Sequence, residues 1–268
     1  MPLSSTSIEA AAEYLTAARR ARRSGDRLPD AYRPADLESA VAIQQRVSKL
    51  LGEQIGAWKT AIPAQDKIHI GPIYASDIYS GSQCPVRPVR ATARIEPEVA
   101  FVLGNDLGAR AQPYTETEVR AAISDTRLVL EILGGRYAEP DTVTFPEKLA
   151  DALNNQALFV GPVIADGLNK KLDRLPIQVD SPDGFHLTRD GVHPSGHPLA
   201  ALLWLANYLS ERGEGLKAGE IVTCGSYCGV LDLPLGKPLR VAFGGLGILS
   251  VEFVDAGESG RAYVKEAN

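Results

Sequence analysis

The segment from Arg94 to Leu103 constrains the fold more than any other part of the chain. It reads Arg-Ile-Glu-Pro-Glu-Val-Ala-Phe-Val-Leu and is predicted to be an extended strand. Side chains alternate between the two faces of a strand, so Glu96 and Glu98 are expected on the same face. Such a pair repels unless a cation lies between its members, and Mg²⁺ prefers oxygen ligands. The alternative is an exposed strand face that carries two solvated glutamates.

Two further charged residues lie in apolar surroundings. Glu131 is the single acid in the predicted strand from Arg127 to Leu133. A carboxylate inside such a run stays charged only with help from a cation or from hydrogen bonds. Lys59 lies in a short β-compatible segment, and it is either a surface residue or, if partly buried, a group that binds a carboxylate or moves protons.

The composition indicates an ordinary soluble protein that acts on a small molecule. The 268 residues are 44% apolar, which is enough for a sizeable core. A formal charge of -5 without any basic block argues against nucleic acid or an anionic membrane as partner. Three unevenly placed cysteines make a disulfide framework improbable. With no apolar leader and no membrane-length apolar run, we expect a cytoplasmic protein.

The chain is expected to open with two helices. The first begins at a capping box, Thr6 to Glu9, and ends in a basic run, Arg19 to Arg23, which we expect to be solvated and to bind no ligand. The second runs from Asp36 to Leu51. With a long loop from Gln65 to Cys84 that covers a site, these helices are predicted to form an N-terminal cap over residues 1–80.

Residues 81–268 are expected to form a β-rich catalytic domain. Three further helices are predicted at Thr115–Ile123, Phe145–Asn155 and from His197-Pro198 onward, between strands that end near Phe253. His193 and His197 are spaced like a helical metal-binding pair, but the prolines that follow each of them break the helix that would align them.

Several motifs, in order along the chain, resemble the 2-keto-4-pentenoate hydratase and 4-oxalocrotonate decarboxylase family, within the fumarylacetoacetate hydrolase superfamily. The resemblance runs from about residue 50 to residue 253. The motifs are Gly56-Ala57-Trp58-Lys59, Glu96 to Leu103, Glu131-Ile132 with Arg136, Gly196-His197-Pro198-Leu199 with Trp204-Leu205-Ala206-Asn207, Gly213 to Val222, and Phe243 to Gly247.

The resemblance implies an α+β fold, a mixed β-sheet roll of the fumarylacetoacetate hydrolase C-terminal type with an N-terminal helical segment. It also implies a homo-oligomer and allows for a partner enzyme of the same pathway. By matching motifs, Glu96, Glu98 and Glu131 would hold Mg²⁺ or Mn²⁺. Lys59 would contact substrate and act in catalysis.

The resemblance extends to three more candidate residues. Asp77 would be an acid–base residue, although its loop matches the family less well. Arg136 and Ser226 are candidates for substrate contact, with a plain turn residue as the alternative for Ser226.

The implied function is a metal-dependent lyase that adds water to a small 2-hydroxy-dienoate or 2-oxo-enoate acid in the catabolism of aromatic compounds. The alternatives are a 4-oxalocrotonate-type decarboxylase, an acylpyruvate C–C hydrolase, and a non-catalytic homologue that acts as a subunit or binding partner.

This chain departs from the family pattern beside the predicted site. Gly134-Gly135 replaces a small polar pair, Ala152 follows Asp151 where the family usually has asparagine, and Gly225 to Gly229 replaces a Ser/Thr-rich segment. Asn154, Asn155 and Gln156 lie near enough in sequence to supply the missing polar groups. These departures bear on the reaction more than on the metal site.

Overall fold

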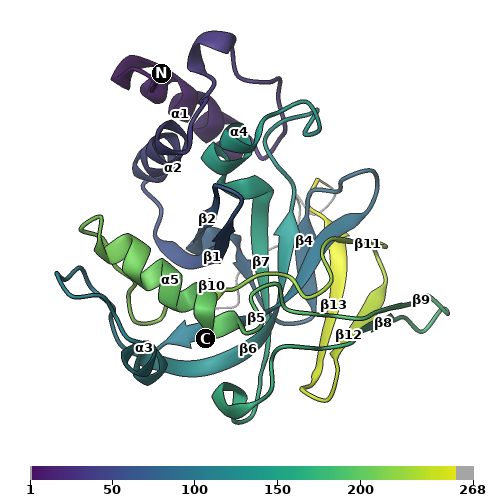
Figure 1. The fold of residues 1–268 in the computed structure, drawn as a ribbon. Helices are drawn as coiled ribbons and strands as arrows, with labels where there is room; N and C mark the ends of the chain where they lie inside the picture. Colours follow the sequence, from purple (N-terminus) through teal and green to yellow (C-terminus); the bar gives the residue numbers. More distant parts are fainter. Residues whose placement is uncertain (1, 258–268) are drawn as a thin grey trace.

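Two β-sheets pack against each other, and helices gather at one end of the larger sheet, in the computed structural model of the protein, which describes residues 2–257 (Figure 1). The α+β roll expected from the sequence is confirmed. None of the helices in residues 2–257 is long and apolar enough to cross a membrane.

The larger sheet has eight strands and mixes parallel and antiparallel pairs. Its order is β2-β1-β10-β5-β6-β7-β3, with β11 pairing with β5 beside β10. Strands β1 and β10 run parallel, as do β3 and β7, whereas β10, β5, β6 and β7 alternate in direction. The bounds are β1 Ile55–Ala64, β2 Lys67–Tyr74, β3 Ile78–Tyr79, β5 Ala93–Leu103, β6 Ile123–Leu133, β7 Asn155–Val163, β10 Ile221–Thr223 and β11 Leu231–Leu233.

A proline is tolerated in the central strand β5 because of how its neighbours are spaced. On one side, β10 pairs with residues 100–102 and β11 with residues 93–95, which leaves Pro97 in the gap between them. The carbonyl of Pro97 faces this gap and accepts a hydrogen bond from the Tyr227 amide at 3.2 Å. Proline has no N–H to give to a ladder, so the gap is where it costs least.

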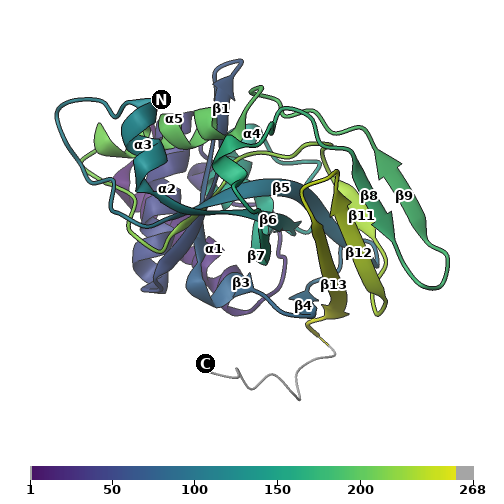
Figure 2. The same cartoon turned by 90° about the horizontal axis from the view of Figure 1, so that it is seen from below.

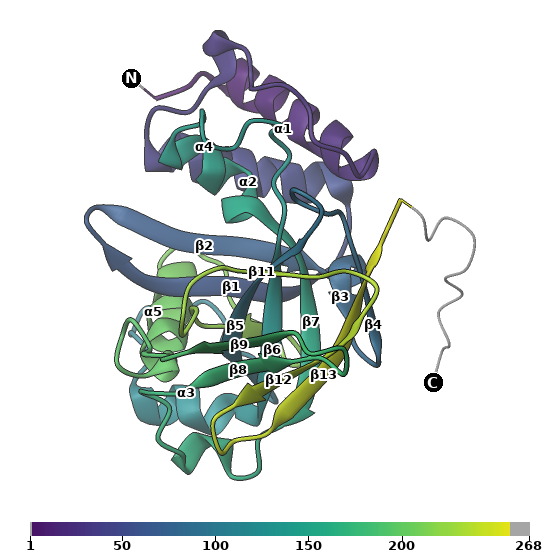
Figure 3. The ribbon, with the colours of Figure 1, turned by 90° about the vertical axis from the view of Figure 1, so that its right-hand side faces the viewer.

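The smaller sheet covers the outer face of the larger one. Its order is β4-β13-β12-β8-β9, and in Figures 2 and 3 it forms a separate layer beside β5, β6 and β7. Buried side chains of both sheets form one apolar cluster, in which Ile95, Leu128 and Leu130 meet Val241 and Phe253. The strands are β4 Gln83–Val86, β8 Ile177–Asp180, β9 His186–Arg189, β12 Pro238–Phe243 and β13 Ile248–Asp255.

Alternation along the central strands therefore decides which residues face the site. Because Leu128, Leu130 and Ile95 point toward the smaller sheet, Glu131 and Glu96 point to the opposite, inner face. A small apolar cluster that includes Ala57, Ala100 and Val129 is separate from the one between the sheets.

The helices lie mainly over the β1–β2 end of the large sheet. Figure 3 shows α1, α2 and α4 stacked above β2. Ser4 caps α1 and Asp36 caps α2, and Gly52 ends α2 with a φ of 67°. The first helix thus begins slightly earlier than the predicted capping box. The helices are α1 Ser5–Arg20, α2 Leu37–Leu51, α3 Glu116–Ala122, α4 Phe145–Ala150 and α5 Pro198–Ser210.

Three expectations from the sequence are wrong in detail. The segment from Gln65 to Cys84 is not one long loop, because it contains β2, β3 and the start of β4. The helix expected over Phe145–Asn155 ends at Ala150. The side chain of Arg19 is only 9% exposed, so the basic run is not wholly solvated. The domain boundary near residue 80 stays a prediction; β1 and β2, which precede it, are hydrogen-bonded into the large sheet.

Candidate metal centre

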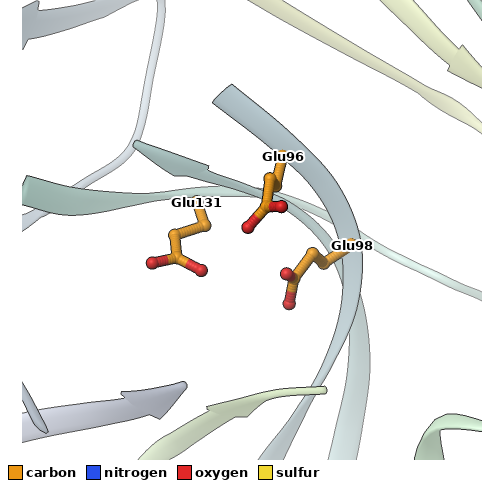
Figure 4. Close-up of side chains that lie close together, drawn as sticks. All are labelled: Glu96, Glu98 and Glu131. Atoms are coloured by element: carbon orange, nitrogen blue, oxygen red, sulfur yellow. The ribbon is translucent and has the colours of Figure 1, made fainter. Parts of the chain in front are cut away.

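Glu96, Glu98 and Glu131 converge on the inner face of the large sheet, as the sequence predicted. Glu96 and Glu131 lie opposite each other across the β5–β6 ladder, and Glu98 follows two residues along β5. One carboxylate oxygen from each lies within 4.8 Å of the others, and Figure 4 shows the three groups turned toward one another. Glu98 is 2% exposed and Glu131 is fully buried, which excludes the alternative of a solvated strand face. We call these residues the glutamate cluster.

Lys59 is the cation that faces the glutamate cluster. Its Nζ lies 2.6 Å from Oε1 of Glu131, and its side chain is 12% exposed. Burial lowers the pKa of Lys59, but the charges of Glu131, Glu96 and Glu98 outweigh burial, so its pKa is raised overall. Three carboxylates thus face one ammonium, and negative charge remains in excess when all of them are ionised.

Backbone and side-chain donors hold two of the glutamates. Oε2 of Glu98 accepts hydrogen bonds from the hydroxyl of Thr223 and, at 2.9 Å, from the amide of Gly225. Oε1 of Glu131 accepts one at 2.9 Å from the side-chain amide of Asn155. The other oxygen of Glu131 is buried and has no hydrogen-bond partner among the described residues. A buried carboxylate oxygen left in this state is costly unless a cation binds it.

Burial and the neighbouring carboxylates raise the pKa values of Glu96 and Glu98. Burial, followed by the charges of Glu131 and Glu96, raises the pKa of Glu98 to about 8, against the effect of the hydrogen bond from Thr223. Burial likewise raises the pKa of Glu96, to which the charge of Glu131 adds. Closely spaced buried carboxylates cannot all ionise cheaply without a compensating cation. The donor set and its electrostatics therefore fit a hard divalent cation such as Mg²⁺ or Mn²⁺.

A left-handed turn after α4 supplies groups to the site. Ala152, Leu153 and Asn154 have φ values of 51°, 52° and 62°, a conformation that costs non-glycine residues free energy. The carbonyl of Leu153 accepts a hydrogen bond from Lys59 at 3.4 Å. A helix over the same residues could not present this carbonyl to Lys59, which explains why the predicted helix ends early.

The Gly134-Gly135 pair makes room for amide side chains from the next strand. A Cβ on Gly134 would lie 2.2 Å from Nε2 of Gln156, and one on Gly135 would lie 2.5 Å from Oδ1 of Asn154. Gln156 is fixed there, because its amide exchanges hydrogen bonds with the backbone of Arg87. The amide groups of Asn154 and Gln156 thus lie in the space beside the Gly-Gly pair. That they replace the absent polar groups stays a prediction.

The remaining candidate residues lie apart from the glutamate cluster. Asp77 lines a cavity of about 400 Å³ together with Arg136. Arg136 is 1% exposed, and its guanidinium is bound to the side chain and carbonyl of Asp151 and, at 2.5 Å, to the carbonyl of Asn155. Ser226 donates to the carbonyl of Gly229 at 3.0 Å. The roles assigned to Asp77, Arg136 and Ser226 stay predictions.

Two residues that hold the cluster were not singled out from the sequence. These are Thr223 and Gly225, and nothing local in the sequence marks them as partners of Glu98. Their placement depends on β10 pairing with β5, a contact between segments more than 120 residues apart.

Comparison with known proteins shows which sequences and structures the chain resembles. The chain is 27% identical over 247 residues to 2-keto-4-pentenoate hydratase from Paraburkholderia xenovorans, covering 84% of this chain and 87% of the relative. It is 28% identical over 260 residues to 2-keto-4-pentenoate hydratase 1 from Dechloromonas aromatica, covering 92% and 97%. The resemblance read from the motifs is thus confirmed: the chain is related to the 2-keto-4-pentenoate hydratases along most of its length.

Among solved structures, the fold matches 4-oxalocrotonate decarboxylase from Pseudomonas putida G7, complexed with magnesium and adipate, with a TM-score of 0.76. The two chains are 20% identical, and the match covers 94% of this chain and 99% of the other. At this identity the likeness establishes the fold. No family model matches the chain.

Proposed function

We propose that this protein is a divalent-metal-dependent lyase that adds water to a small 2-hydroxy-dienoate or 2-oxo-enoate acid, in the catabolism of aromatic compounds. The observation that carries the proposal is the glutamate cluster, with ligand oxygens within 4.8 Å of one another and a buried oxygen of Glu131 without a partner. The names of the sequence relatives, which are hydratases of this substrate class, support the same reaction.

The proposed cofactor is Mg²⁺ or Mn²⁺, held by Glu96, Glu98 and Glu131. When bound, the cation would supply positive charge that stabilises the enolate form of a 2-oxo acid. The relatedness of the fold to a protein crystallised with magnesium supports this choice.

The protein's own groups would bind the acid and handle its protons. Lys59 stays charged because its pKa is raised, so its ammonium can orient the substrate carboxylate and offset its charge. Asp77 is the proposed acid–base residue: burial raises its pKa against the opposing charges of Arg19 and Arg136, which favours a carboxyl group that can hold a proton. Arg136 would contact the substrate from the wall of the cavity that it shares with Asp77. Ser226 would contact it from the loop that follows Gly225.

Decarboxylation of a 4-oxalocrotonate-type acid is the second candidate, because loss of a distal carboxylate draws on the same enolate stabilisation. Two substrates separate the reactions. The purified protein with Mg²⁺ is incubated with 2-hydroxypenta-2,4-dienoate and with 4-oxalocrotonate, and ultraviolet loss and CO₂ release are followed. We expect loss of the dienoate without CO₂ release in the wild type.

Matched variants connect that activity with the site. Glu131→Gln should abolish turnover, whereas Glu38→Gln, an exposed control in α2, should leave it unchanged. If CO₂ release from 4-oxalocrotonate is the faster reaction, the protein is a decarboxylase rather than a hydratase. An acylpyruvate is supplied as a third substrate, and its cleavage would indicate the C–C hydrolase. Turnover of none of the three substrates would indicate a non-catalytic homologue.

The proposal includes a cytoplasmic homo-oligomer that works with an enzyme of the same pathway, which consumes the product. Light scattering coupled to size-exclusion chromatography tests the assembly. A protein that elutes as a monomer at micromolar concentration would contradict it.

A further inference from the structure

One cavity on the described part of the chain has five arginines in its lining. It has a volume of about 400 Å³ and lies where the end of α1, the turn before β3 and the end of β4 meet. Two acids, Asp77 and the exposed Glu53, also line it. Its arginines are Arg19, Arg20, Arg22, Arg87 and Arg136. We call it the arginine cavity.

Arg19 is the arginine whose donors are least used. Its side chain is 9% exposed, and its nearest carboxylate oxygen, Oδ1 of Asp151, is 3.8 Å away. That same oxygen already accepts a hydrogen bond from Nε of Arg136. The remaining contact of Arg19 is with the face of the Tyr74 ring, 5.4 Å from its centroid. No described residue accepts a hydrogen bond from this guanidinium, although guanidinium groups normally bind oxyanions through two parallel bonds.

The charges around Arg19 do not balance. Arg87 donates one hydrogen bond to the carbonyl of Gly134, at 2.9 Å, and has no carboxylate partner among the described residues. Burial, followed by repulsion from Arg136, lowers its pKa to about 10. Arg136 likewise repels Arg19 and lowers its pKa, after burial. The acids that line the cavity beside these arginines are Asp77, whose pKa is raised by burial, and Glu53. Positive charge concentrated in a partly closed cavity attracts anions.

The arginine cavity is next to the glutamate cluster but distinct from it. None of the three glutamates nor Lys59 lines it. One residue lies between the two: the carbonyl of Asn155 accepts from Arg136 at 2.5 Å, and its side-chain amide donates to Glu131 at 2.9 Å.

We propose that the arginine cavity binds a small oxyanion, the carboxylate or phosphate group of a soluble metabolite, through Arg19 and Arg87. Two residues of this cavity, Asp77 and Arg136, also have roles in the reaction proposed above, but binding of the oxyanion itself needs neither the metal nor turnover. The oxyanion has two possible sources, which are the second acid group of a longer substrate and a separate effector molecule.

Calorimetric titration of the full-length protein in EDTA tests the site with inorganic phosphate and with succinate as probes. We expect at least one probe to bind. Arg19→Met should weaken that binding by about tenfold or more, the loss expected for a charge-assisted pair of hydrogen bonds. Arg19→Lys should retain part of it, and Arg87→Met gives a second test of the same cavity.

Two controls separate this site from general charge and from the metal centre. Arg23→Met removes an exposed arginine from the same basic run, and Glu96→Gln alters the glutamate cluster. Both should bind the probe as the wild type does. Absence of binding by either probe, or equal binding in the wild type, Arg19→Met and Arg87→Met, would overturn the proposal, provided that circular dichroism shows the variants folded.

Competition distinguishes the two sources of the oxyanion. If the bound probe inhibits turnover of the diacid 4-oxalocrotonate but not of the monoacid 2-hydroxypenta-2,4-dienoate, the cavity holds a substrate's distal acid group. If binding persists and neither turnover is inhibited competitively, the ligand is a separate effector. Each result thus shows whether the bound oxyanion belongs to the substrate or to a separate effector. In the first case, Arg19→Met should remove the inhibition.

Discussion

The ammonium of Lys59 lies 2.6 Å from a carboxylate oxygen of Glu131, although β10 and β5 separate their strands in the large sheet. In a flat sheet three strand spacings of about 4.8 Å would hold β1 and β6 about 14 Å apart. Side chains stand roughly perpendicular to a sheet, so these two could not meet across it. The ion pair therefore depends on the curl of the sheet, which makes Lys59 and the glutamate cluster parts of one site.

Lys59→Met tests the charge balance of that site. Breaking a buried ion pair leaves Glu131 uncompensated, which costs about 3–5 kcal/mol when one partner of such a pair is removed. We expect the metal-free variant to melt below the wild type, and saturating Mn²⁺ to raise its melting temperature by more than it raises that of the wild type. Differential scanning fluorimetry with and without Mn²⁺ measures both, with Lys171→Met as the exposed control. Equal Mn²⁺-induced shifts in the wild type and Lys59→Met would contradict the prediction.

Asn155→Ala tests whether the hydrogen bond to Glu131 orients a metal ligand. Loss of a group that orients a ligand lowers metal affinity by about 10–100-fold, and Asn155 donates to Glu131 at 2.9 Å. Isothermal titration with Mn²⁺ should show this loss, while Asn105→Ala, on an exposed turn, should bind as the wild type does. An unchanged dissociation constant in Asn155→Ala would mean that Glu131 does not need this donor.

Gly134→Ala tests the close approach of Gln156. The added Cβ would lie 2.2 Å from Nε2 of Gln156, whose amide is held by the backbone of Arg87. We expect a loss of about 1–3 kcal/mol in the free energy of unfolding, as for other overpacked sites. Gly108→Ala, which has open space around it, should cost less.

A double variant shows whether the clash is the cause. Adding Gln156→Ala to Gly134→Ala should recover part of the stability, so that the two changes are coupled rather than additive. Additive losses in urea unfolding would locate the cost elsewhere.

The sequence predicted the metal-binding glutamates better than the contacts that hold them in place. Alternation placed Glu96 and Glu98 on one face, and the apolar run around Glu131 marked a carboxylate that needed compensation, because these signals are local. The curl that brings Lys59 to Glu131, and the approach of Thr223 to Glu98, depend on pairing between distant strands. Such pairing leaves no local pattern in one sequence.

The predictions of a helix from Phe145 to Asn155 and of a solvated basic run were wrong because of contacts with distant segments. Apolar spacing after Phe145 suggested one helix, but the carbonyl of Leu153 is bound by Lys59, and this contact outweighs helix propensity over three residues. The basic run after α1 was expected to be solvated because arginines near a helix end usually are. Arg19 instead lies against the ring of Tyr74 and near Asp151, contacts with distant segments that the run itself does not encode.

His193 carries a pH dependence of stability. It is 2% exposed; Nε2 donates to the carbonyl of Cys224 at 2.9 Å, and Nδ1 accepts from the amide of Ser195 at 3.2 Å. Burial lowers the pKa of His193 from its ordinary value of 6.5 to about 4. A protonated Nδ1 would also face the Ser195 N–H. The neutral form is thus favoured in the folded state.

Because the folded-state pKa is the lower one, the unfolded chain binds the proton first as pH falls. The stabilising contribution of neutral His193 is present above pH 6.5 and is lost as pH falls toward 4, by about 1–3 kcal/mol. His193→Gln should flatten this part of the stability profile, whereas the exposed His186→Gln should not. Urea unfolding at a series of pH values measures it, and identical slopes for wild type and His193→Gln would count against a neutral buried imidazole.

The glutamate cluster is the centre of the account, and direct metal binding is its most immediate test. Isothermal titration of the metal-free protein with Mn²⁺ should give one site per chain. Glu96→Gln and Glu131→Gln should each weaken it by about 100-fold or more, since each removes an anionic ligand from a set of three. Glu38→Gln should bind as the wild type does. A wild-type protein that binds no Mn²⁺, or Glu96→Gln and Glu131→Gln variants that bind it with unchanged affinity, would contradict the account.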